Sequence, residues 1–272
     1  MNNKQCVIVI PVHSPSPSAF ELISFKQCFK ILGKHSIKVI APEGLNLNEY
    51  LKAVPNFDVL YINPFWQASL QNYNRLKYSR YFYNLLNNYQ FILTYELDAF
   101  VFSDNLSEWC NKNYDYIGAP WFEGFDNPIN ETEFLGVGNS GFSLRKTKQI
   151  QKILKTYYYK SPDEYNVGNK KKLVATLKYP YRKLMNILSG ENYTLQHSYK
   201  EYSEDRLFCL DIAKTTTFNI APMNEAIRFS FEVNPSVLYK MNNHELPMGC
   251  HAWWKYDLDF WRPFIASEGY DI

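Results

Sequence analysis

The stretch VIVIPVHSPSPSAFELISFKQCFKILG, residues Val7 to Gly33, contains the unit that decides the fold. Its first six residues are apolar, which is typical of a fully buried strand that Pro11 ends. A helix follows, because Ser18 and Glu21 have the spacing of a capping box and Gly33 stands where a helix C-terminus is expected. A buried strand followed by a capped helix is the repeating unit of a parallel α/β sheet.

The same alternation continues along the chain. Strands are expected at residues 37–41, 57–62 and 91–98, and helices at 45–54 and 71–86. Strands that alternate with helices at this spacing indicate a mostly parallel central sheet with helices on both faces. Ligands of such sheets bind at the carboxyl ends of the strands. The sequence therefore predicts an α/β fold with a ligand site at that edge.

Two acids interrupt the apolar strand FILTYELDAFVF, Phe91 to Phe102. Glu96 and Asp98 are two residues apart, so on a strand they would share one face. A buried carboxylate needs a cation or a hydrogen-bonding ligand. Mg²⁺ and Mn²⁺ prefer carboxylate oxygens, so a divalent cation is one interpretation. The other is that one acid caps the next element or pairs with an arginine.

After Asp98 the strand and helix pattern changes. YDYIGAPWFEGF (114–125) and GVGNSGFSLR (136–145) each contain a strand next to a glycine-bearing loop, and residues 147–159 are expected to form a helix. The glycine spacing is not G-x-G-x-x-G, and no strand is expected directly before it, so a dinucleotide-binding turn is rejected. A basic stretch at about 160–202 is expected to be an inserted lobe or a flexible region. It is either a solvated surface or one that faces an anionic acceptor or membrane; its basic residues are Lys170, Lys171, Lys172, Lys178, Arg182, Lys183 and Lys200.

Composition excludes several classes of protein. A length of 272 residues, 46% of them hydrophobic and 21% charged, is typical of one globular α/β domain. A formal charge of +2 argues against a dedicated nucleic-acid-binding protein. The five cysteines form no C-x-x-C pair, which fits a reducing compartment. The chain begins without a secretory pattern and has no apolar run long enough to span a bilayer, so a cytoplasmic location is expected.

Several segments resemble a known group of enzymes. The order of five segments is that found in GT-A-fold glycosyltransferases: VIVIPV, the acid-x-Asp at the end of the fourth strand, GNSGFSLR, SEDRLF (203–208) and GCHAW (249–253). A closer resemblance is to a bacterial glycosyltransferase-like family of unknown function that is linked to surface-polysaccharide genes. The segments that carry it include YELDAFVF, YDYIGAPWFEGF, EAIRFSFEVNP and LPMGCHAW. This resemblance implies a single GT-A-like domain over 1–272. Residues 1–102 would form its nucleotide-binding half, and 103–272 its acceptor-binding half with the basic insertion.

The resemblance implies roles for five site residues. Asp98 matches the last acid of the family's D-x-D motif and His251 its late histidine, so both are expected to bind Mn²⁺ or Mg²⁺. Glu96 takes the first motif position, where Glu replaces the usual Asp, and is expected to contact the donor ribose or nucleotide. Asp205 matches the general base that deprotonates the acceptor hydroxyl in an inverting transfer, with Glu204 beside it. Without the resemblance, these two acids complement a helix dipole and His251 is a core histidine.

The remaining site residues are also expected from the resemblance. A loop with close backbone approach at 136–141 makes Asn139 and Ser140 candidates for donor-sugar contacts. Aromatic rings pack on sugar faces, which makes the segment Trp121, Phe122 and Glu123 the expected acceptor platform, with Trp253 and Trp254 weaker candidates. The expected nucleotide contacts are Pro11, Val12, His13, Glu43, Asn74 and Lys77.

The expected function is the metal-dependent transfer of a sugar from a nucleotide-sugar, by default UDP-linked, to a glycan or lipid-linked glycan in bacterial surface polysaccharide synthesis. The basic region would give peripheral contact with the inner face of the membrane. Two alternatives stay open. A non-catalytic carbohydrate-binding or scaffold protein could keep the fold, and a nucleotidyltransferase or phosphohydrolase could use the same acids.

Overall fold

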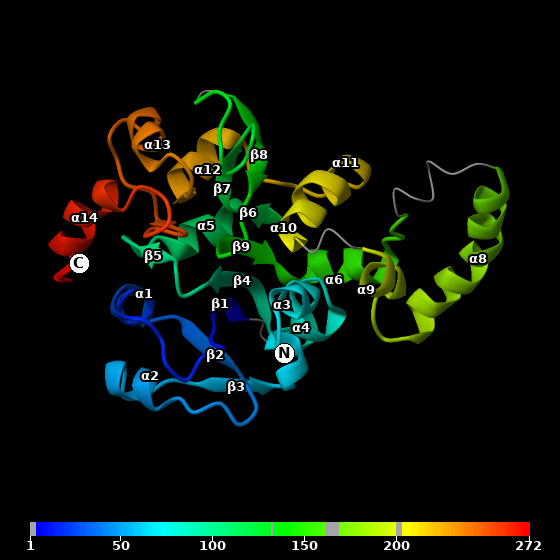
Figure 1. The fold of residues 1–272 in the computed structure, drawn as a ribbon, viewed down its shortest axis with the longest axis horizontal. Helices are drawn as coiled ribbons and strands as arrows, with labels where there is room; N and C mark the ends of the chain where they lie inside the picture. The colour runs from blue at the N-terminus through cyan, green and yellow to red at the C-terminus, as the bar shows by residue number, and fades with distance from the viewer. Residues whose placement is uncertain (1–3, 132, 161–168, 200–202) are drawn as a thin grey trace.

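The computed structural model describes residues 4–131, 133–160, 169–199 and 203–272, and all of their side chains except those of 169–176 and 215. Within these residues, a six-stranded sheet has the order β3-β2-β1-β4-β9-β6 (Figure 1). β1, β2, β3 and β4 are parallel, and β9 is antiparallel to both of its neighbours. The strands are β1 (Lys4–Pro11), β2 (Ser36–Pro42), β3 (Val59–Ile62), β4 (Tyr89–Tyr95), β9 (Phe142–Lys146) and β6 (Tyr116–Ile117). The predicted α/β fold with a mostly parallel sheet is confirmed.

Helices cover both faces of this sheet. Along β1, Ile8 and Ile10 pack with Phe25 in one core cluster, whereas Val7 and Val9 belong to the cluster on the opposite face. The first face is covered by α1 (Ala19–Leu32), α2 (Asn48–Ala53) and α5 (Leu106–Lys112). The second face is covered by α3 (Leu70–Lys77), α4 (Arg80–Leu85) and α6 (Thr147–Thr156). The 3-10 helix η1 (Pro64–Gln67) leads from β3 to α3.

The predicted cap of the first helix is present, whereas the helix predicted at 71–86 is divided into two. The capping box of α1 is present, because Ser18 accepts a hydrogen bond from the Glu21 backbone and Glu21 accepts one from the Ser18 backbone. The single helix expected at 71–86 is wrong, since α3 ends before Tyr78 and α4 begins after Ser79. The buried Ser79 side chain caps α4 by accepting from the Phe82 backbone, and a serine cap of this kind favours a break in a helix.

The strand expected at 91–98 ends at Tyr95. The prediction that Glu96 and Asp98 share one face of a strand is therefore wrong. The chain turns there, with the Ala99 backbone donating to the Glu96 carbonyl oxygen. It then enters β5 (Phe100–Val101), which joins β11 (Gly249–Cys250) and β10 (Ser230–Phe231) in a second sheet. The acids therefore lie in the turn that connects the two sheets.

The glycine-rich segment also differs from its prediction, because a strand precedes it. β8 (Phe134–Gly138) pairs with β7 (Ala119–Phe122) as an antiparallel hairpin, and the chain then passes through Asn139 into β9. No strand was expected directly before the glycines, and that part of the prediction is wrong. The rejection of a dinucleotide-binding turn holds, since β9 and not a helix follows the loop.

The C-terminal part covers the second sheet. A third core cluster gathers around Trp253 and Trp261, both fully buried, so core packing explains Trp253. The helices of this part are α12 (Met223–Phe229), α13 (Pro235–Met241) and α14 (Leu258–Ser267). Before them, α10 (Glu204–Arg206), the π-helix η2 (Leu207–Ile212) and α11 (Ala213–Thr215) form one continuous helical segment. SEDRLF thus begins a helix, as predicted.

The basic stretch contains α8 (Asn169–Leu188) and α9 (Tyr193–Ser198). Figure 1 shows α8 at one extremity of the molecule, away from the sheets. Of the predicted basic residues, Lys200 and the side chains of Lys170, Lys171 and Lys172 lie outside the described residues. Among the helices that are described, none combines the length and the apolar character needed to cross a bilayer.

Candidate metal centre and adjoining cavities

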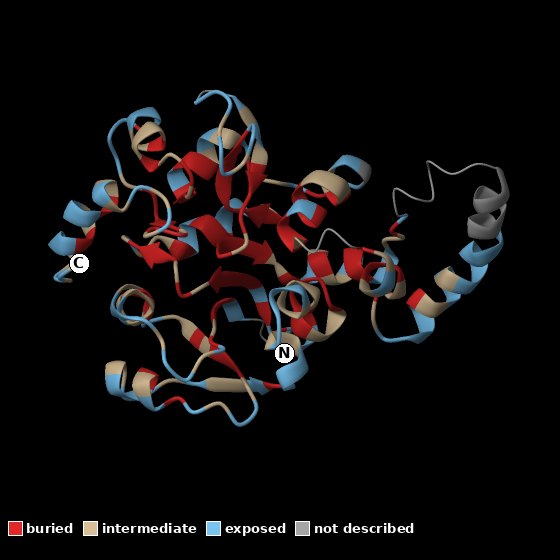
Figure 2. Ribbon diagram, viewed as in Figure 1, coloured by how far each residue is buried: buried red, intermediate tan, exposed pale blue. Residues whose placement is uncertain are grey.

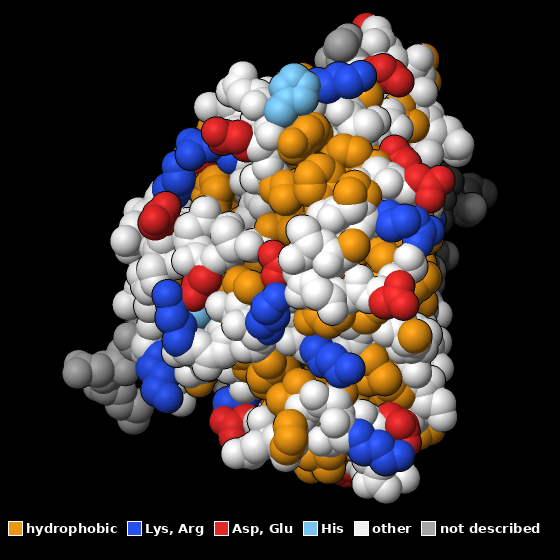
Figure 3. All heavy atoms as spheres, turned by 90° about the vertical axis from the view of Figure 1, so that its left-hand side faces the viewer, with side chains coloured by type: hydrophobic (Ala, Val, Ile, Leu, Met, Phe, Trp, Pro, Cys, Tyr) orange, Lys and Arg blue, Asp and Glu red, His pale blue; other side chains and the backbone are white. Residues whose placement is uncertain are grey.

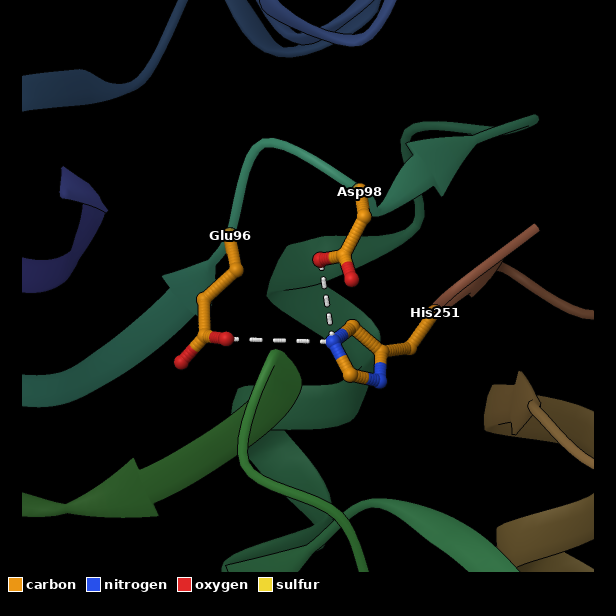
Figure 4. Close-up of side chains that lie close together, drawn as sticks. All are labelled: Glu96, Asp98 and His251. Carbon is orange, nitrogen blue, oxygen red and sulfur yellow. Dashed lines mark ion pairs between the residues drawn. The ribbon is translucent and has the colours of Figure 1, made fainter. Parts of the chain in front are cut away.

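Glu96, Asp98 and His251 meet at the junction of the two sheets (Figure 4). Glu96 directly follows β4, Asp98 lies in the turn before β5, and His251 directly follows β11. His251 Nε2 lies 3.0 Å from Asp98 Oδ1 and 3.8 Å from Glu96 Oε2. One potential ligand atom from each residue lies within 4.8 Å of the other two. The pairing of β11 with β5 thus brings His251 to the acids across more than 150 residues of chain.

The other ring nitrogen of His251 is held from outside this triad. Nδ1 lies 2.8 Å from Glu232 Oε1 and 3.0 Å from Asn139 Nδ2. A proton on Nδ1 donated to the Glu232 carboxylate leaves the Nε2 lone pair directed at the two acids. Nε2 is buried and has no hydrogen-bond partner among the described residues.

Acids around His251 set its proton affinity. Burial alone disfavours the imidazolium, but the charge of Asp98 and contacts with Glu232 and Glu96 outweigh it and raise the pKa of His251 well above its ordinary value. A divalent cation bound at this site would therefore compete with a proton for Nε2. Two carboxylates and an imidazole, with Nε2 facing both acids, form a donor set suited to Mn²⁺ or Mg²⁺, and the imidazole favours Mn²⁺ of the two.

Gly141 makes room for the imidazole. A Cβ atom at this position would lie 2.0 Å from His251 Nε2, far inside van der Waals contact. The carbonyl oxygen of the same residue accepts a hydrogen bond from the Glu96 backbone at 2.7 Å. The glycine after Ser140 therefore contacts two of the three members of the triad.

Glu96 is anchored by polar groups from α3 and the loop before β9. Its Oε1 atom accepts hydrogen bonds from Tyr73 Oη at 2.9 Å, Lys77 Nζ at 3.0 Å and Ser140 Oγ at 3.2 Å. Burial raises the pKa of this carboxyl group, but the charges of Lys77 and His251 outweigh burial and hold it well below its ordinary value. Glu96 is thus ionised, with Oε1 occupied and Oε2 directed toward His251.

A second carboxylate shares the Lys77 ammonium group with Glu96. Glu204, fully buried, lies 3.3 Å from Lys77 Nζ and 2.5 Å from the Arg145 guanidinium. Burial opposes its ionisation, yet Lys77 and Arg145 lower the pKa of Glu204 below its ordinary value. Glu204, the expected neighbour of the general base Asp205, is therefore an ion-paired structural group that links the triad to α10.

The first cavity has a volume of about 410 Å³ and opens at the carboxyl ends of β1 and β4. This is the edge at which the sequence predicted a ligand site. Of the predicted nucleotide contacts, Pro11 and His13 line it, while Val12 is fully buried in the core. The complete lining consists of Pro11, His13, Glu21, Gln67, Ala68, Ser69, Leu70, Tyr73, Glu96, Leu97, Asp98 and Trp254.

The second cavity, of about 200 Å³, contains Asp205. Asp205 accepts hydrogen bonds from the Ser203 hydroxyl and, at 2.9 Å, from the Arg206 backbone. Burial and the neighbouring Glu204 charge raise its pKa to about 6. Two of the predicted acceptor contacts are also here; the lining consists of Trp121, Phe122, Phe125, Asp126, Ser203, Asp205, Arg206, Glu232 and Val233.

Three of the predicted binding residues line neither of the two cavities found among the described residues. Glu43 and Glu123 are exposed, and Asn74 is half-buried on α3; none of the three is in either lining. Lys77, Asn139 and Ser140 are near the triad but contact its side chains instead of lining a cavity. Glu204 is likewise outside both linings.

Sequence reasoning missed four residues of this centre. Glu232 contacts His251 and lines the second cavity, Tyr73 and Arg145 hold Glu96 and Glu204, and Ser203 holds Asp205. Arg145 had no local signal, because its partner Glu204 is brought to it only by the packing of the chain. Glu232 follows a strand of two residues, which is too short to give a recognisable alternation of apolar and polar residues.

Three solved structures illustrate what this chain is similar to in fold. Mouse xyloside xylosyltransferase 1 is 9% identical, with a TM-score of 0.48, over 91% of this chain and 97% of that one. The galactosyltransferase LgtC, with donor and acceptor sugar analogues, is 14% identical, with a TM-score of 0.42, over 90% and 86%. CMP:2-keto-3-deoxy-manno-octonic acid synthetase is 10% identical, with a TM-score of 0.39, over 65% and 86%.

Comparison with curated proteins gave no match. A family model described as a protein of unknown function (DUF5672) matches residues 56–251, well over half of the chain. The matched segment contains Glu96, Asp98, Asp205, Glu232 and His251, and so covers both the triad and the acid of the second cavity. This chain therefore belongs to the DUF5672 family.

Proposed function

We propose that this protein is a glycosyltransferase that uses a divalent cation to transfer a sugar from a nucleotide-sugar to an acceptor hydroxyl. One observation carries the proposal. Glu96 and Asp98 of the triad line a cavity of about 410 Å³, and His251 contacts Glu232, which lines a second cavity that contains Asp205. Two cavities that are linked through a candidate cation site suit a reaction between two substrates.

The first cavity would hold the donor. Its volume falls in the range of cavities that bind small molecules, and Asp98 and Glu96 open into it. When bound, Mn²⁺ or Mg²⁺ would supply positive charge that offsets the charge of the leaving nucleoside diphosphate. Asp98 and His251 are assigned as its ligands. Glu96 either completes the set through Oε2 or, as the motif implies, accepts a hydrogen bond from a donor hydroxyl.

The second cavity would hold the acceptor. Trp121 and Phe125 give it an aromatic wall, and Asp205 is its buried acid. A carboxyl group with a pKa of about 6 is ionised at neutral pH and is also basic enough to take a proton from an attacking hydroxyl. Asp205 is thus assigned as the general base of a single inverting displacement.

The motifs of the sequence extend the proposal further. They favour a glycan or lipid-linked glycan acceptor and a role in bacterial surface polysaccharide synthesis in the cytoplasm, and a UDP-linked donor is taken as the family default. A single domain over 1–272, with the donor bound by its first half, fits the position of the first cavity at the ends of β1 and β4.

Calorimetric titration with UDP-, GDP- and CMP-sugars, with and without Mn²⁺, tests the proposal. One donor is expected to bind in a cation-dependent manner and to release its nucleotide on turnover, a nucleoside diphosphate from a UDP- or GDP-sugar and CMP from a CMP-sugar. Asp98→Ala is expected to abolish both properties, while Asp58→Ala, at an exposed surface acid, leaves them unchanged. Full turnover in Asp98→Ala would disprove the assignment of the metal ligand.

The products separate the alternatives. A nucleotidyltransferase would release pyrophosphate and a phosphohydrolase would release phosphate, so either product in place of a nucleoside diphosphate would replace the proposed reaction. A binding or scaffold protein would release no product from any donor and show no cation requirement.

A further inference from the structure

Helix α8 (Asn169–Leu188) exposes a continuous apolar stripe. Leu177, Tyr181, Leu184 and Leu188 are 70%, 56%, 51% and 67% exposed, and their spacing of four, three and four residues places them on one side of the helix. Ile187, 68% exposed, widens the same stripe. Figure 2 shows that the surface of α8 is largely exposed along its described length.

The opposite side of α8 attaches the helix to the protein. Asn186 is buried and accepts a hydrogen bond from the Thr194 backbone at 3.0 Å. It also donates to the Tyr157 carbonyl oxygen at 3.4 Å. At 100° per residue, position 186 lies across the helix from positions 177, 184 and 188. The apolar stripe therefore faces away from the body to which the helix is bound.

The charge of the protein is concentrated on the same helix. α8 contains six basic residues and no acid, whereas the whole chain has a formal charge of +2. The rest of the chain, with 23 basic and 27 acidic residues, thus has a formal charge of −4. At the far end of the molecule, Figure 3 shows acidic and basic side chains intermingled. Lys178 and Lys183 are exposed on the two flanks of the stripe.

We propose that α8 lies in the interface of a membrane that contains anionic lipids, with its apolar stripe toward the acyl chains. An apolar face flanked by lysines, with a tyrosine in the stripe, has the properties of an interfacial helix. Charge complementarity identifies the lipid, because basic residues beside a membrane surface attract anionic headgroups. A nucleic acid would satisfy the lysines but leave the stripe in water. This inference is independent of the reaction that the protein catalyses.

Sedimentation of the full chain with lipid vesicles tests the proposal. At low salt, we expect binding to vesicles with about one third phosphatidylglycerol in phosphatidylcholine, and at least tenfold weaker binding to phosphatidylcholine alone. The stripe variant Leu177→Gln/Leu184→Gln/Leu188→Gln should bind at least tenfold more weakly. Its matched control is Ile129→Gln, which changes an apolar residue that is 81% exposed on the hairpin loop.

The contribution of charge needs its own pair of variants. Lys178→Gln/Lys183→Gln should weaken binding to the anionic vesicles at least tenfold, while Lys148→Gln/Lys214→Gln, which removes two exposed lysines elsewhere, should not. Circular dichroism of every variant checks that the helix is retained. Cation-dependent donor binding measured without vesicles should be unchanged, which separates this surface from the proposed active site.

Three results would overturn the proposal. The first is no sedimentation with anionic vesicles at low salt. The second is unchanged binding of the stripe variant with helicity retained. The third is self-association of the unaltered protein in the absence of lipid that the stripe variant abolishes, because a second copy of the chain would then cover the stripe.

Discussion

The Nδ1 atom of His251 lies 2.8 Å from Oε1 of Glu232, and this contact joins the two cavities. His251 contacts Asp98, which lines the first cavity, while Glu232 lines the second cavity together with Asp205. A change at either residue can therefore affect the lining of both cavities.

Glu232→Gln is expected to weaken Mn²⁺ binding about 10- to 100-fold, because an amide holds the Nδ1 proton less strongly and no longer fixes the Nε2 lone pair toward the acids. Electron paramagnetic resonance titration of Mn²⁺ measures the loss. Glu245→Gln, at an exposed acid of the same segment, serves as the control. Equal Mn²⁺ affinity in Glu232→Gln and the unaltered protein would show that Glu232 does not orient the histidine.

Asp205→Asn is expected to lower kcat about 10²- to 10⁴-fold, since an amide cannot accept the acceptor proton. In the unaltered protein, kcat should fall as the pH drops below about 6, where Asp205 takes up a proton. Steady-state kinetics between pH 5 and 8 measures both effects, because this interval includes pH values below and above the pKa of Asp205. A variant that retained the kcat of the unaltered protein would require another base or a retaining mechanism.

The same substitution should stabilise the fold at pH 8. The pKa of Asp205 is about 6 in the folded protein against an ordinary value of 3.8, so the folded state binds the proton more tightly. Stability therefore falls as the pH rises from about 4 to about 6, by about 3 kcal/mol for a shift of this size. Asp205→Asn removes that penalty and should raise Tm at pH 8, whereas Asp271→Asn, at an exposed acid, should not. An unchanged or lower Tm would show that the ionised group is not destabilising.

Lys77→Met is expected to lower the free energy of unfolding by about 3–5 kcal/mol, because it leaves the fully buried Glu204 and the partly buried Glu96 with one cation fewer. Lys52→Met breaks a comparable contact with Glu49 on the exposed side of α2 and should cost under about 1 kcal/mol. Urea unfolding of the two variants gives the comparison. Similar losses for both would contradict a structural role for the buried pairs.

Gly141→Ala is expected to weaken Mn²⁺ binding as strongly as His251→Ala, since the added methyl group occupies space that the imidazole now fills. Gly44→Ala is the control for strain alone. Its φ is 83°, and a Cβ there meets no atom within 4 Å, so it should lower stability without changing Mn²⁺ affinity. Normal Mn²⁺ binding by Gly141→Ala would mean that the ring can move aside.

The sequence was sufficient for the sheet and for the first helix. Apolar strands such as Val7–Val12 and the cap formed by Ser18 and Glu21 are local signals, and both are present in the structure. The two-residue strands β5, β10 and β11 were missed, since they contain too few residues to show a period. That omission hid the second sheet.

The site was predictable only where a motif stood beside a long strand. Glu96 and Asp98 were identified because they follow β4, although the face-sharing argument for them was wrong. Their contact with His251 was expected only from a resemblance, since it depends on β11 pairing with β5. The buried pairing of Glu204 with Lys77 and Arg145 depends on packing between α10, α3 and β9, for which the sequence has no local signal.

The close approach of Gly141 to His251 links two positions that are far apart in the chain. A side chain at 141 and an imidazole at 251 cannot occupy the same space, so substitutions at the two positions should be correlated during evolution. Relatives that have lost the histidine would be free to acquire a side chain at the glycine, and those that keep one should keep the other. Covariation between these two positions would then separate members with the triad from members without it.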